Sequence, residues 1–137
     1  MTDTIKLDAF TRAYIQTALW ATNDESEESG GVPLDQNYGP EDIALETLAR
    51  IVEDCARFQR QQHDVLANAI QTGKVKCGPD FNEVEHAGHD FFLTRDHHGA
   101  GFWDGDWPEP YATTLTNAAH AFGSFDLYVG DDGLIYA

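Results

Sequence analysis

Apolar residues recur every three or four positions at the start of the chain. Phe10 and Tyr14 belong to a stripe that continues over five turns, which predicts an amphipathic helix over residues 5–22. Thr4 or Asp3 can cap this helix, since both side chains accept hydrogen bonds from free backbone amides of a first turn.

A second helical stripe follows an acidic linker. Residues 23–38 contain NDESEESGG and predict an exposed loop. Pro40 and two carboxylates then open a stripe that ends at Gly73. Because its middle, RFQRQQHD, is polar, residues 40–72 are expected to form either one long helix or two collinear helices.

The pattern changes in the second half of the chain. DFFLTR (90–95) and AGFWD (100–104) flank a four-residue connection, which predicts a β-hairpin. A short helix is expected over 111–122. After it, FDLYVGDDGLIYA alternates apolar residues around a turn at 130–133, which predicts a second hairpin.

These elements predict an α+β fold. We expect two N-terminal helices, then two β-hairpins separated by a helix, forming an antiparallel sheet packed on the helices. The whole chain, 1–137, is expected to be one domain with a helical part over 1–73 and a β-rich part over 77–137. Four aromatic residues are expected in the core: Trp103, Trp107, Tyr128 and Tyr136. A homodimer would cover a hairpin that is aromatic on both faces.

The chain is strongly acidic. It has 24 Asp and Glu against 8 Lys and Arg, a net charge of −16, and no Lys or Arg after Arg95. The negative electrostatic field of this charge disfavours direct binding to nucleic acids or to anionic membranes, and it favours a partner with a basic surface. The sequence begins without a signal peptide and contains no long apolar run, so a cytoplasmic protein is expected. Cys55 and Cys77 are not expected to form a disulfide.

Four of the six histidines lie in the block HAGHDFFLTRDHHGAGFWDGD, residues 86–106. His86, His89 and Asp90 offer imidazole and carboxylate ligands for zinc or a similar divalent ion. Their side chains share a face on a helix or a turn, but diverge on a strand. On the predicted hairpin, His97 and His98 lie at the far end and cannot join the same ion. The alternative interpretation is that these histidines only form structural hydrogen bonds.

Acid–base chemistry is a second interpretation of this block. His89 or His98 would act beside an aspartate, of which the block offers Asp90, Asp104 and Asp106. No nucleophile motif or phosphate-binding loop is present. The block therefore supports a small metal-dependent or His/Asp-dependent enzyme without indicating its reaction.

Arg95 and the glycines of the block are expected to be structural. Arg95 is expected to pair with a carboxylate rather than to bind an anion. Gly99 and Gly101 allow a tight turn and close packing.

The second half of the chain contains a distinctive series of short motifs. They are His89-Asp90-Phe91, Leu93-Thr94-Arg95, Gly99, Gly101-Phe102-Trp103-Asp104 and the run LYVGDDG from Leu127 to Gly133. In these motifs the chain resembles, over roughly residues 85–137, a family of small proteins encoded by bacteriophages, prophages and other mobile elements of proteobacteria. The resemblance implies a protein made in a bacterial cytoplasm and implies no activity.

This context and the charge together favour an accessory protein that binds a host or defence protein, with carboxylates in the role of nucleic-acid phosphates. The alternatives are the enzyme described above, a structural role in the phage particle, and a charge that only maintains solubility. The candidate interaction residues are Glu41, Asp42, Glu46, Glu53, Asp54, Asp104, Asp106, Asp131 and Asp132. The first loop adds Asp24, Glu25, Glu27 and Glu28.

Overall fold

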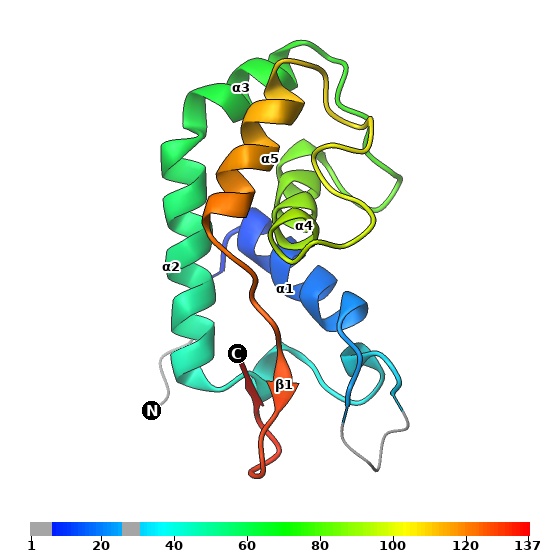
Figure 1. Cartoon of the computed structure of the whole chain (residues 1–137), viewed down its shortest axis with the longest axis vertical. Helices are drawn as coiled ribbons and strands as arrows, with labels where there is room; N and C mark the ends of the chain where they lie inside the picture. The colour runs from blue at the N-terminus through cyan, green and yellow to red at the C-terminus, as the bar shows by residue number, and fades with distance from the viewer. Residues whose placement is uncertain (1–6, 26–30) are drawn as a thin grey trace.

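Helices make up most of the structure (Figure 1). The computed structural model describes residues 7–25 and 31–137. The α-helices are α1 (Ala9–Ala21), α2 (Leu45–Gln61), α3 (His63–Gln71), α4 (Glu83–Arg95) and α5 (Tyr111–Ala121). The remaining elements are the 3-10 helices η1 (Leu34–Gln36) and η2 (Pro40–Asp42) and the strands β1 (Tyr128–Val129) and β2 (Ile135–Tyr136). The expected α+β fold with two hairpins is therefore wrong: the described residues form a helical domain with one two-stranded sheet.

The first helix forms where its apolar stripe predicts it. Asp8 is its N-cap, because the amide of Thr11 donates a hydrogen bond of 2.8 Å to Asp8 Oδ1. The caps expected from the sequence, Thr4 and Asp3, lie outside the described residues, as do the first two residues of the predicted helix. The helix ends at Thr22, whose amide donates to the carbonyl of Ala18.

The second stripe forms two helices rather than one. The break falls at Gln62, in the polar middle of the stripe, where the backbone leaves helical geometry with φ −106° and ψ 18°. The helix α3 turns away from the axis of α2, so the two are not collinear (Figure 1). Pro40 starts the separate η2, and the stop at Gly73 is confirmed by its left-handed φ of +69°.

The first predicted hairpin is wrong. DFFLTR is the last half of α4, and residues 100–104 are turns without strand pairing. The helix begins with a capping box, in which Asn82 and Glu85 exchange two hydrogen bonds of 2.9 Å. All six residues from Asp90 to Arg95 are buried. The part expected to be β-rich, 77–137, is thus largely helix and turn.

The other two elements of this half are confirmed. The helix α5 matches the prediction over 111–122, and Gly123 ends it with φ +77°. The strands β1 and β2 pair antiparallel, with Tyr128 opposite Tyr136. The amide of Ala44 donates to the carbonyl of Ile135 at 2.9 Å, which attaches this hairpin to the start of α2.

An aromatic core lies between α1, α2 and α4. The rings of Phe58 and Phe91 stack with centroids 4.2 Å apart. The helices α1 and α4 form the most extensive contact, and a Cβ added to Gly88 of α4 would collide with the carbonyl oxygen of Phe10 of α1. Both backbones therefore approach closely because residue 88 is glycine.

The four aromatic residues that were expected in the core differ in their burial. Trp107 is buried, as expected, whereas Trp103 is 51% exposed and Tyr128 is 56% exposed, so their expected burial is wrong. Tyr136 is half-buried and stacks on Tyr128. No helix among the described residues is long and apolar enough to cross a membrane.

Candidate functional site

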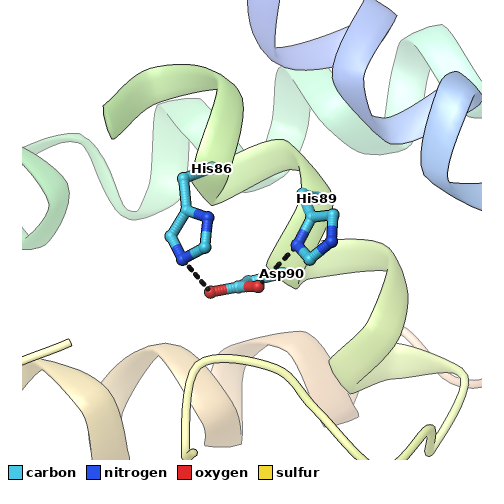
Figure 2. Close-up of side chains that lie close together, drawn as sticks. All are labelled: His86, His89 and Asp90. Carbon is cyan, nitrogen blue, oxygen red and sulfur yellow. Dashed lines mark hydrogen bonds and ion pairs between the residues drawn. The ribbon is translucent and has the colours of Figure 1, made fainter. Parts of the chain in front are cut away.

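Three side chains of α4 converge at the position where a β-strand was expected to begin (Figure 2). His86, His89 and Asp90 share one face because they are three and four positions apart on the helix. His86 Nε2 lies 3.2 Å from Asp90 Oδ2, and His89 Nδ1 lies 2.8 Å from Asp90 Oδ1. The structure thus brings the three candidate metal ligands together, with one ligand atom of each within 4.8 Å of the others.

Asp90 is the centre of the cluster. Its side chain is 1% exposed, and it forms no ion pair with an arginine or lysine of the described chain. The indole Nε1–H of Trp107 donates to Asp90 Oδ2 at 2.7 Å. A buried carboxylate needs such partners, because desolvation penalises its charge. This role of Trp107 could not be predicted from the sequence, because the residue lies 17 positions after Asp90 and outside α4.

Asp106 adds a second carboxylate to the cluster. Its Oδ2 atom lies 3.1 Å from His86 Nε2, and its side chain is 36% exposed. A single imidazole nitrogen therefore faces two carboxylates, although it can carry only one proton. The ring of His86 also stacks with the rings of His89 and Trp107, with an interplanar angle of 13° to each.

The remaining histidines of the block do not join this cluster. His98 Nε2 lies 3.2 Å from Asp96 Oδ2, beyond the end of α4. His97 has a positive φ of 57°, and its ring stacks on His120 with centroids 4.8 Å apart. Of the histidine–aspartate pairs expected for acid–base chemistry, the structure forms His89 with Asp90. Asp104 instead accepts a hydrogen bond from the amide of Gly101.

Of the three candidate ligands on α4, His89 is the most exposed, with 23% of its side chain accessible. Its ring contacts Phe81, with centroids 5.4 Å apart. It lines two hollows of about 540 and 240 Å³, both of which are also lined by Trp20 of α1. The importance of Trp20 was missed from the sequence, because it lies outside the apolar stripe that predicts the helix and has no motif around it.

Cys77 lies within electrostatic range of the cluster. The pKa of its thiol is raised by burial and by the negative charges of Glu83, Asp106 and Asp90. The neighbouring amide of Lys76 donates to the carbonyl of Asp106 at 2.8 Å. Both cysteines are free thiols, with Cys55 buried in the core.

Arg95 pairs with a carboxylate, as predicted. It is buried at the end of α4 and donates to Asp54 Oδ2 at 2.9 Å. It also donates to the hydroxyl of Tyr14 and to the carbonyls of Phe122 and Gly123. One guanidinium therefore connects α4 to α1, α2 and the end of α5.

A second acidic pair lies beyond α4. Burial, together with a hydrogen bond that the protonated Asp96 donates to the carboxylate of Asp126, raises the pKa of Asp96 to about 6. The amide of Phe125 donates to Asp96 Oδ1 at 3.1 Å and opposes this rise. Asp96 therefore carries a proton at a pH where an ordinary aspartate does not.

The acidic candidate residues do not form one face. Five of the nine accept hydrogen bonds within the chain: Asp42, Asp54, Asp104, Asp106 and Asp132. The others are exposed: Glu41, Glu46, Glu53 and Asp131. The hairpin and the start of α2 lie at one end of the molecule, whereas the loop after α4 lies towards the other end (Figure 1). Of the first loop, Asp24 is buried, Glu25 is exposed, and Glu27 and Glu28 lie outside the described residues.

Comparison of the chain with known protein families, with curated proteins and with solved structures finds no match. The resemblance to proteins of phages and mobile elements stays a prediction, because none of these comparisons tests it.

Proposed function

We propose that this protein binds one divalent transition metal ion, with zinc as the first candidate, through His86, His89 and Asp90. The observation that carries the proposal is the convergence of two carboxylates on His86 Nε2. A single proton on His86 Nε2 balances only one of the two carboxylate charges, whereas a divalent cation would balance both. The donor set of two imidazoles and a carboxylate matches the ligand preferences of zinc.

The present distances support this assignment. Zinc lies about 2.0–2.2 Å from nitrogen and oxygen ligands, so the ligand atoms of a tetrahedral site lie somewhat more than 3 Å apart. His86 Nε2 and Asp90 Oδ2 already have this separation, at 3.2 Å. His89 would need only a side-chain rotation, since all three ligand atoms lie within 4.8 Å of one another.

Three protein ligands leave one position of a tetrahedral zinc ion for water, which is the arrangement of catalytic rather than structural sites. A zinc-bound water ionises near neutral pH and is a strong nucleophile. Asp106, the most exposed acid of the cluster, would supply negative charge beside that position. The proposed class of activity is therefore metal-assisted hydrolysis of an uncharged substrate, in which the water oxygen would bond to an electrophilic atom, the bond to the leaving group would break, and a proton of the water would pass to that group.

The first prediction is that untagged protein, stripped with a chelator and titrated calorimetrically with Zn²⁺, binds one equivalent. His89→Gln should weaken binding by more than about 100-fold, because replacing even the outer partners of metal ligands costs about 10–100-fold in affinity. Asp90→Asn should do the same, while keeping an oxygen that can accept from Trp107.

The matched control uses the two stacked surface histidines. His97→Gln and His120→Gln remove an exposed imidazole pair that lies outside the cluster. Both should leave the affinity within about twofold of the original value. Equal losses from the control variants and from His89→Gln, or an unchanged affinity in His89→Gln, would show that zinc binds surface histidines and not this site.

A second candidate function is favoured by the charge. The excess of 16 negative charges, with no lysine or arginine after Arg95, supports an accessory protein that binds a basic region of a host or defence protein. This function does not require the metal, and the two can coexist in one molecule.

A further inference from the structure

Two adjoining hollows form a groove beside the histidine cluster. Trp20 and His89 line both hollows, which therefore meet at these two side chains. The larger hollow continues along Leu93 and Ala100, and the smaller one along Phe81 and Asp80. We call this the Trp20 groove.

The walls of the groove are mostly apolar and aromatic. Trp20 is 59% exposed, although a tryptophan on a core helix normally buries most of its ring. Its indole is thus available to a ligand along the groove rather than used in packing. An exposed indole face attracts cations through its ring quadrupole.

The charges around the groove favour a positively charged ligand. Among the described residues, the lining contains the carboxylate of Asp80 and no lysine or arginine. The field of the whole chain, with its net charge of −16, has the same sign. Polyanions are therefore repelled, whereas a positively charged segment is attracted at long range and can be held at short range by Trp20 and Asp80.

We propose that the Trp20 groove binds a basic peptide segment of a partner protein, with an arginine side chain on the indole of Trp20 and a second basic side chain at Asp80. The proposal rests on the accessory binding function and names the surface that performs it. Trp20 and Asp80 lie outside the proposed metal ligands, but His89 lines the groove, so the peptide is tested on the metal-free protein.

The test uses a defined probe, a short peptide of alternating arginine and alanine, titrated calorimetrically into the full chain at low ionic strength with a chelator present. A peptide of alternating glutamate and alanine should not bind. Trp20→Ala should weaken binding of the basic peptide by about fivefold or more, as expected for the loss of a cation–π contact.

Two matched variants separate the groove from general charge attraction. Trp103→Ala removes another exposed indole, and Asp131→Asn another exposed carboxylate, neither of which lines the groove. They should change the affinity by less than about twofold, whereas Asp80→Asn should weaken binding like Trp20→Ala. Circular dichroism checks that each variant is folded.

Equal effects of the groove variants and their controls would show that the Trp20 groove is not the binding site, while the proposed binding of a basic partner would stand. No binding of the basic peptide at low salt would overturn both.

Discussion

Among the glycines that the structure describes, Gly88 leaves the least space for a side chain. Any side chain at this position would meet the backbone carbonyl of Phe10, and backbone cannot move aside as a flexible side chain can. The contact between α1 and α4 is the most extensive in the molecule, so a displacement there would disturb the aromatic core on both sides.

Gly88→Ala is therefore expected to destabilise the protein by about 2–3 kcal/mol, the cost of overpacking a tight core. Alanine has the better intrinsic helix propensity, so a preference of the helix alone would predict the opposite sign. Urea unfolding measures the difference. Gly78→Ala is the control, because a Cβ there meets no atom within 4 Å, and it should stay within about 0.5 kcal/mol.

The acidic pair of Asp96 and Asp126 predicts a pH dependence of stability. The pKa of Asp96 is raised to about 6 in the folded protein, so its proton stabilises the fold at low pH. That stability is lost as the pH rises through about 6, when two carboxylates come to face each other.

Asp126→Asn should therefore raise the melting temperature at pH 7.5 by roughly 2–4 °C and give little gain at pH 4.5. Thermal melts at both pH values measure this. An equal gain at the two pH values would mean that the two carboxyl groups do not share a proton.

At the scale of elements, Arg95 connects the end of α4 to three other helices. Its guanidinium contacts Asp54 of α2, the hydroxyl of Tyr14 of α1, and two carbonyls after α5. A lysine has neither the planar fork nor the number of donors to replace these bonds.

Arg95→Lys is thus expected to cost about 3 kcal/mol, because it leaves buried acceptors without a partner. Arg57 pairs with the same aspartate at 3.8 Å but is half-exposed, so Arg57→Lys should cost less than about 1 kcal/mol. Chemical unfolding of the two variants compares them directly. Similar losses would show that Asp54 alone, and not the network, determines the effect.

The helix α4 also explains why the fold was partly mispredicted. Helical periodicity is visible only where one face is polar, as on α1 and α2. The last six residues of α4 are buried on all sides, so DFFLTR has the composition of a strand and no helical stripe. The capping box of Asn82 and Glu85 was the signal that could have identified this helix from the sequence.

At the scale of the molecule, the ligands of the candidate site were predictable and their setting was not. The spacing of His86, His89 and Asp90 is local, so it could be found in the sequence once a helix was considered. Asp106 and Trp107 reach the cluster through the turns that follow α4, whose course depends on tertiary packing. The net charge was evident at once, but which acidic residues are exposed and which accept hydrogen bonds within the chain required the structure.

The indole of Trp107 donates to Asp90 and stacks on His86, so the candidate site contains its own fluorophore. The other two tryptophans, Trp20 and Trp103, are exposed and can be replaced by phenylalanine without opening the core. The resulting chain would emit from a single tryptophan in direct contact with the cluster. Its spectrum and lifetime would then report what occupies the site in real time, without any attached dye.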